Sequence, residues 1–152
     1  MGEYVFIREN LQCRVAPLGT LADYMFVVIC SRYGDRWLLS RHRERTTYET
    51  QGGHIEAGEQ PLDAAMRELY EESGVQDASI YPVCDYCGYD DHGFANGVVY
   101  LAVIHSLGEL PQSEMAEIAL FDELPANLTY PHVSPKLFAE AERVLVQLKK
   151  NP

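Results

Sequence analysis

Residues 53–75 read GHIEAGEQPLDAAMRELYEESGV, a stretch that combines glycines, a proline and six acidic side chains. Pro61 suits the first position of a helix, and Gly74 suits the left-handed residue that ends one. The sequence therefore predicts a helix over Pro61–Ser73 that begins and ends at defined residues.

Three glutamates of this helix share one side. Steps of about 100° per residue place Glu68, Glu71 and Glu72 within an arc of about 100°. We expect the buried side of the helix to lie beside this arc, at Leu62, Met66 and Leu69. Ionised carboxylates at this spacing repel one another, and a hard divalent cation, magnesium or manganese, would remove the repulsion.

The common alternative for an acidic helix is a solvated face that binds nothing. The preceding segment favours a metal site instead. Gly52, Gly53 and Gly58 predict a loop whose backbone can approach a ligand without obstruction from side chains. The same loop brings Glu56 and Glu59 to the start of the helix.

Outside this region strands alternate with few helices. Met25–Ser31 is a continuous apolar run typical of a strand buried on both faces, and Arg36–Arg41 is its hairpin partner. A final helix is predicted from an N-cap at Ser134 to about Lys149, with an apolar stripe of Leu137, Ala141, Val144, Leu145 and Leu148. Further strands are predicted at Tyr4–Ile7, Ser79–Tyr86, Val98–Ser106 and Glu117–Phe121, and a polar loop at residues 90–97. This order indicates an α/β fold.

Length and charge limit the classes of protein that the chain can belong to. Its 152 residues suit one domain, residues 1–152. With 12 basic and 23 acidic residues the net charge is −11, which disfavours binding to nucleic acid or to anionic membranes. No apolar run is long enough to cross a membrane and no signal peptide is apparent, so we expect a cytoplasmic protein. The sequence leaves a homodimer open.

The four cysteines give no clear site. Cys30 lies in an apolar run and is expected to be a buried small hydrophobe. Cys84 and Cys87 form one C-x-x-C pair, which is half of a structural zinc site. We expect unligated thiols there, and a redox pair or a zinc site stays as the alternative.

The stretch from Gly53 to Val75 resembles the Nudix box, whose pattern is G-x5-E-x7-R-E-U-x-E-E-x-G-U with U aliphatic. Every specified position matches over 23 residues. The resemblance implies the Nudix fold, a mixed β-sheet sandwiched between α-helices. It also implies divalent-metal-dependent hydrolysis of a phosphoanhydride bond in a nucleoside diphosphate derivative.

The resemblance further implies roles for single residues. Glu71 and Glu72 match the principal metal ligands, and Glu68 matches a carboxylate that acts as ligand or base. The backbone carbonyl of Gly52 matches a further metal contact. Arg67 and Glu59 match the pair that orients the helix. Relatives commonly have proline before the two glycines, where this chain has Gln51, so we expect a less rigid loop.

The general base is open between two regions, because Nudix enzymes place it either in the box or on a later loop. Glu68 represents the first region, and Glu114 and Glu117 represent the second. A basic cluster at residues 41–45 either grips substrate phosphates or neutralises the acidic helix, and Arg41 is the better candidate for the grip. Gly53 and Tyr89 are candidate substrate contacts.

The substrate class is inferred only from the absence of sequence features that mark other Nudix subfamilies. The features typical of enzymes for ADP-ribose, diadenosine polyphosphates and coenzyme A are absent outside the box. We therefore expect a nucleoside triphosphate, oxidised or not, to be cleaved to the monophosphate and pyrophosphate. The alternatives are hydrolysis of ADP-ribose or nucleotide sugars, a nucleotide sensor without turnover, and an isomerase of isoprenyl diphosphates.

Overall fold

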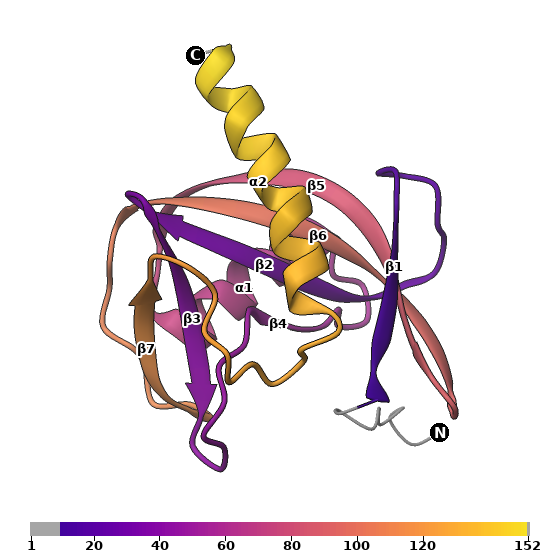
Figure 1. Cartoon of the computed structure of the whole chain (residues 1–152), viewed down its shortest axis with the longest axis horizontal. Coiled ribbons are helices and arrows are strands. Elements are labelled where there is room, and N and C mark those ends of the chain that lie inside the picture. Colours follow the sequence, from indigo (N-terminus) through magenta and orange to yellow (C-terminus); the bar gives the residue numbers. More distant parts are fainter. Residues whose placement is uncertain (1–9, 152) are drawn as a thin grey trace.

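Strand β2 (Tyr24–Tyr33) lies inside a seven-stranded sheet and pairs with three other strands. In the computed structural model, which describes residues 10–151, β2 runs parallel to β6 (Gly93–Ser106). It runs antiparallel to β3 (Arg36–His42) and to β4 (Gln51–His54). The order across the sheet is β1-β5-β6-β2-β3-β7, with β1 at Gln12–Ala16, β5 at Asp77–Asp90 and β7 at Met115–Phe121 (Figure 1).

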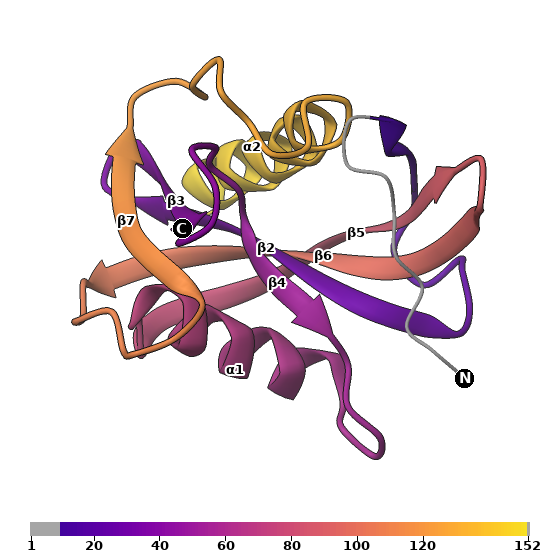
Figure 2. The same cartoon turned by 90° about the horizontal axis from the view of Figure 1, so that it is seen from below.

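Two helices cover opposite faces of this sheet, α1 (Pro61–Ser73) and α2 (Ser134–Lys150) (Figure 2). Side chains of α1 pack on one face with Val27, Ile29 and Leu38. Side chains of α2 pack on the other face, around Leu39 and Leu101. This arrangement confirms the predicted α/β fold with a mixed sheet between helices.

The prediction of a loop at Gly52 and Gly53 is wrong, because both residues belong to β4. They pair with Val28 and Val27 of β2, respectively. A side chain at position 52 would overlap the carbonyl oxygen of Val27, so only glycine allows this close approach. The first glycine of the box is therefore held on the sheet, and the loop begins only after His54.

The prediction of a polar loop at residues 90–97 is also wrong. β5 and β6 form a long hairpin, and only Asp91 and His92 lie outside the two strands. The prediction followed the polar composition, whereas the backbone groups of β5 are paired with β6 on one side and β1 on the other.

Helix α1 has the predicted bounds but not the predicted packing. Leu69 is buried, whereas Leu62 and Met66 are 45% and 53% exposed. The buried side instead carries Ala64 and Ala65. Their small side chains let the helix backbone lie close to the sheet, so the larger residues are displaced outward.

Helix α2 begins one residue earlier than expected, since Ser134 is its first residue rather than its N-cap. The backbone N–H of Ser134 donates to the carbonyl of Tyr130, and no side chain caps the helix. The predicted apolar stripe is confirmed, with Leu137, Ala141 and Leu145 buried.

The cysteines at positions 13, 30, 84 and 87 are all free thiols. Cys30 is fully buried as expected, and Cys84 packs in the core beneath α2. The predicted strand at Tyr4–Ile7 lies outside the described residues. Within residues 10–151, neither helix is long and apolar enough to span a membrane.

Gly74 ends α1 in a left-handed conformation with φ of 81° and lies directly against the backbone of Glu109. Gly19 has the same conformation, with φ of 82°, but no atom lies near the position of its missing side chain. We expect Gly19→Ala to lower the free energy of unfolding by about 1 kcal/mol through backbone strain alone. Gly74→Ala should cost more than about 2 kcal/mol, because its methyl group also meets Glu109.

Urea denaturation followed by the fluorescence of the single tryptophan, Trp37, measures both losses. Equal losses in the two variants would show that the contact with Glu109 contributes nothing.

Candidate active site

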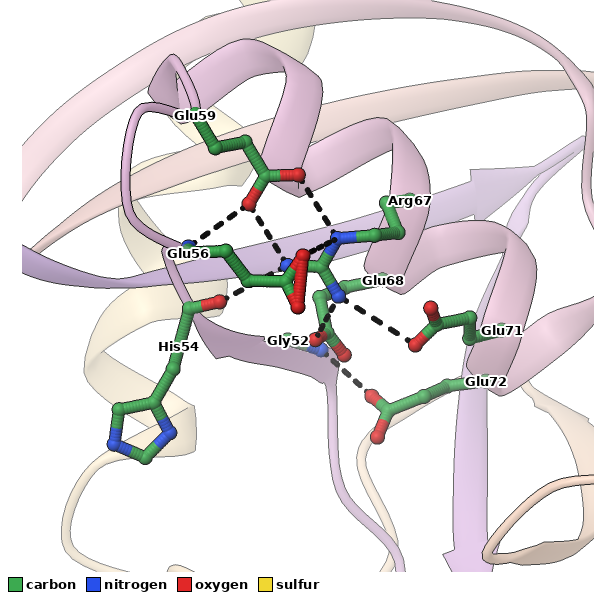
Figure 3. Close-up of polar contacts among 8 residues, drawn as sticks. All are labelled: Gly52, His54, Glu56, Glu59, Arg67, Glu68, Glu71 and Glu72. Carbon is green, nitrogen blue, oxygen red and sulfur yellow. Dashed lines mark hydrogen bonds and ion pairs between the residues drawn. The ribbon is translucent and has the colours of Figure 1, made fainter. Parts of the chain in front are cut away.

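The guanidinium of Arg67 links the loop before α1 to the helix itself (Figure 3). Its Nε and Nη2 atoms donate to the two carboxylate oxygens of Glu59, both at 2.9 Å. Nη2 also donates to the carbonyl of His54 at 3.0 Å, at the end of β4. The hydrogen bonds from Arg67 lower the pKa of Glu59 to about 2. One cation thus fixes the helix, the loop and the strand relative to one another.

The same guanidinium faces the acidic side of α1. Nη1 lies 2.8 Å from Glu68 and 3.5 Å from Glu71, and Nε lies 3.6 Å from Glu56. The side chain of Glu68 is 12% exposed, against 49% for Glu71. Burial raises the pKa of Glu68 although Arg67 opposes that shift. Glu68 is therefore the more enclosed carboxylate of the two.

Glu72 is held by the backbone of β4 rather than by Arg67. The N–H of Gly52 donates to Oε1 of Glu72 at 2.8 Å (Figure 3). Burial raises the pKa of Glu72 to about 9, and the carboxylates of Glu68, Glu49 and Glu114 add to the increase. A buried carboxylate among other acids is stable in its ionised form only beside a cation.

Gly53 leaves the space that the carboxylate of Glu68 fills. A side chain at position 53 would begin 2.6 Å from Oε1 of Glu68. The first glycine of the box is thus required by the close packing of β4 against α1.

The donor set fits a divalent cation in kind, because the carboxylates of Glu68, Glu71 and Glu72 and the backbone of Gly52 offer oxygen only. The three carboxylates lie on the side of α1 that faces Gly52 (Figure 3). They do not converge, since Arg67 contacts two of them and Gly52 the third. Accordingly, no group of three or more acidic, histidine or cysteine side chains between residues 10 and 151 is arranged to enclose an ion.

A cavity of about 330 Å³ opens beside Gly52 and Gly53. Its walls include Phe26, which lies 4.3 Å from the ring of His54, together with Tyr86 and Tyr130. Flat aromatic walls of this kind suit a planar ring such as a nucleobase.

Glu49 is a cavity residue that the sequence did not indicate. Its side chain is only 9% exposed, lies 3.2 Å from Arg45 and belongs to the cavity lining. Its backbone is hydrogen-bonded to that of Ser40, whose hydroxyl donates to the carbonyl of Glu72, so Glu49 lies close to the acidic helix. A single acid followed by Thr50 and Gln51 carries no recognisable motif, so no signal was available for it.

The later-loop glutamates differ sharply in their surroundings. Glu117 accepts hydrogen bonds from Arg41 at 2.8 Å and from Tyr48 at 2.6 Å, and these lower its pKa. Glu114 is 81% exposed and lies 3.7 Å from His42. The structure therefore brings Arg41 to Glu117, across β3 and β7, rather than to the helix carboxylates.

The structure does not place Tyr89 near the other candidate site residues. It lines a separate hollow, where the guanidinium of Arg14 lies 5.3 Å from its ring centre. Tyr86 and Gly88 of the same strand line the cavity beside the box. Because successive residues of a strand point to opposite faces, Tyr89 faces away from that cavity.

A family model described as NUDIX domain matches residues 21–141. The chain belongs to the Nudix family. It is 36% identical over 105 residues to YtkD of Bacillus subtilis (strain 168), which is assigned as an 8-oxo-dGTP diphosphatase. It is 33% identical over 81 residues to the ADP-ribose pyrophosphatase of the same organism. The matches cover 67% and 49% of this chain but only 64% and 43% of those relatives.

Solved Nudix structures share the fold over most of the chain. The pyrophosphohydrolase BsRppH of Bacillus subtilis matches with a TM-score of 0.74 and 26% identity, over 95% of this chain and 98% of that one. The NUDIX domain of Shewanella oneidensis NrtR, solved with ADP-ribose, matches with a TM-score of 0.65 and 18% identity. That match covers 82% of this chain and 90% of the NrtR domain.

The packing of the Nudix box predicts the effect of Gly53→Ala. The added methyl group meets the end of a flexible side chain, so Glu68 moves away from Arg67 while the fold is kept. We expect a stability loss of about 1–2 kcal/mol and a larger loss of any activity that depends on Glu68. Gly58→Ala is the control, because its positive φ of 79° gives a similar stability loss of about 1 kcal/mol while nothing lies within 4 Å of its added methyl group. A Gly53→Ala protein as active as Gly58→Ala would contradict this role of the glycine.

Proposed function

We propose that the chain hydrolyses a phosphoanhydride bond in a nucleoside diphosphate derivative, with a nucleoside triphosphate, oxidised or not, as the first candidate. The observation that carries this proposal is the aromatic cavity whose wall includes Gly52 and Gly53, the two residues that contact Glu72 and Glu68 of α1. A nucleobase in the cavity would leave its phosphates beside the carboxylates.

The names of the relatives support the same substrate class. YtkD is assigned to 8-oxo-dGTP and the second relative to ADP-ribose, and both compounds contain a nucleoside joined to a diphosphate. Hydrolysis of ADP-ribose is the second candidate, because this relative is nearly as similar as the first. A cytoplasmic location, expected from the sequence, is part of the same proposal.

Glu68, Glu71, Glu72 and the carbonyl of Gly52 would hold magnesium or manganese. When bound, such ions neutralise the diphosphate oxygens and lower the pKa of an attached water. Arg67 and Gly52 hold these glutamates before any ion arrives, and the carboxylates would turn toward one another as they bind the ion.

The general base must take a proton from the attacking water. Glu117 is poorly suited, because Arg41 and Tyr48 both donate to it and lower its pKa. Glu114 is exposed, and its charge acts on Glu72, so it is the better candidate on the later segment. Glu68 remains the candidate within the box.

Two of the proposed substrate contacts, Arg41 and Tyr89, do not belong to the cavity wall. Arg41 would have to share its guanidinium between a phosphate and Glu117. Tyr89 would reach a substrate only through the separate hollow that it lines. Gly53, in contrast, belongs to the wall of the cavity itself.

A nucleotide panel tests the proposed function. Purified protein is incubated with canonical and oxidised nucleoside triphosphates, ADP-ribose and nucleotide sugars, with magnesium and with a chelator, and the products are separated by chromatography. We expect a monophosphate and pyrophosphate from at least one triphosphate, only with the metal. Glu72→Gln should lose more than 90% of the rate, because it removes a ligand charge. Exposed Glu142 supplies the matched control, Glu142→Gln, with an unchanged rate. Binding of nucleotide without any product would instead indicate a sensor.

A magnesium titration of Gln variants distinguishes the candidate bases. A ligand contributes to metal occupancy, whereas a base contributes to the transition state by typically 10²–10⁴-fold. If Glu114 is the base, Glu114→Gln should be slow at every magnesium concentration, while Glu68→Gln recovers much of its rate as magnesium rises. Glu117→Gln is expected to lose stability more than rate. Full activity in both later-segment variants would leave Glu68 as the base.

A further inference from the structure

Gln51 precedes the two glycines of β4, and its side chain makes a buried hydrogen-bond network. Its side chain is completely buried. Oε1 accepts from the hydroxyl of Ser31 at 2.6 Å, and Nε2 donates to Ser40 Oγ at 2.9 Å and to the carbonyl of Leu38 at 3.3 Å. Both polar atoms of its side-chain amide are therefore bonded within the sheet.

The network continues to the acidic helix. Ser40 donates its single hydroxyl proton to the backbone carbonyl of Glu72 at 2.7 Å. Ser40 must then accept from its other neighbour, and only the amide end of Gln51 can donate there. The direction of the whole chain of hydrogen bonds is thus set, from Ser31 through Gln51 and Ser40 to Glu72.

The carbonyl of Glu72 lies in the last turn of α1, where helices leave carbonyl groups without partners. The C-terminal cap, Gly74, donates to Tyr70 and not to Glu72. The bond from Ser40 therefore satisfies an end carbonyl and joins the helix to β3 at the position of a candidate ligand.

Glu72 is attached at both ends to groups that Gln51 connects. Its carbonyl is bonded to Ser40, and its carboxylate accepts from the N–H of Gly52 at 2.8 Å. Gly52 follows Gln51 in the chain, and Ser40 is bonded to the side chain of Gln51. Because a displacement of Gln51 would shift both attachments together, this residue sets where the carboxylate of Glu72 lies relative to the carbonyl of Gly52.

We propose that Gln51 is a positioning residue that, through Ser40 and Gly52, holds Glu72 at the place on α1 from which it would bind a divalent cation. This inference rests on the proposed function, since it concerns the metal that the hydrolysis requires. Gln51 touches no substrate and acts only through the two groups that hold Glu72.

Ser73 provides a matched control for the link through Ser40. Both serines are completely buried, and each donates its hydroxyl proton to a carbonyl of α1. The hydroxyl of Ser73 donates to Leu69 at 2.5 Å and accepts from the N–H of Val75 at 3.2 Å, so both of its bonds stay within the helix and the residue after its cap. Ser40→Ala removes a tie between helix and sheet, whereas Ser73→Ala removes bonds that do not connect them.

The test measures Mn²⁺ affinity by electron paramagnetic resonance, without nucleotide, and the melting temperature of the metal-free protein. We expect Ser40→Ala and Ser73→Ala to lower the melting temperature by similar amounts. Ser40→Ala should raise the Kd for Mn²⁺ at least tenfold, which corresponds to about 1.4 kcal/mol, and Ser73→Ala less than twofold. Gln51→Met, which keeps the side-chain length but removes its hydrogen bonds, should follow Ser40→Ala.

Equal Kd values for the Ser40→Ala and Ser73→Ala proteins would overturn the proposal, as would wild-type protein that binds no Mn²⁺. The result is independent of hydrolysis. Wild-type protein that binds Mn²⁺ but cleaves no nucleotide in the panel would refute the proposed function, while the comparison of Kd values would still decide the role of Gln51.

Discussion

The bidentate pair between Arg67 and Glu59 is the interaction on which the rest of the site depends. It fixes the loop between β4 and α1 against the helix. Arg67 also donates to the carbonyl of His54, which joins the loop and the helix to the end of β4. The same guanidinium balances two acids of the helix, Glu68 and Glu71, of which Glu68 is the more enclosed. Among residues 10–151, the ion pairs to the acids of α1 all come from Arg67.

The sequence predicted the parts of the fold that are encoded by local signals. Pro61 and Gly74 set the ends of α1 because each residue has a backbone preference that acts without any partner. The strand at Gln51–His54 could not be predicted in this way, since two glycines and two polar residues become a strand only when β2 lies beside them. Leu62 and Met66 were misplaced because periodicity does not show that Ala64 and Ala65 allow a closer approach.

The residues of the candidate site also differ in whether a local sequence pattern indicates them. The residues of the box were found from spacing alone, whereas the cavity residues Phe26, Glu49 and Tyr130 come from three separate segments and share no pattern. Tyr89 shows the limit most clearly. One residue of strand register decides whether a tyrosine faces the cavity or the opposite side of the sheet, and register is set by pairing with β1 and β6.

The parallel pairing of β2 with β6 also has a consequence for how the molecule assembles. These two strands, with Val28 opposite Val99, enclose between them the chain that contains β3, β4 and all of α1. Bringing β2 and β6 together costs chain entropy before the contacts between them compensate for it. Contacts between residues so far apart in the sequence form slowly. A nascent chain that has not yet reached residue 99 can form the β2–β3 hairpin but not this pairing. The acidic helix then lacks part of the sheet face against which it packs, so the site should appear late in folding.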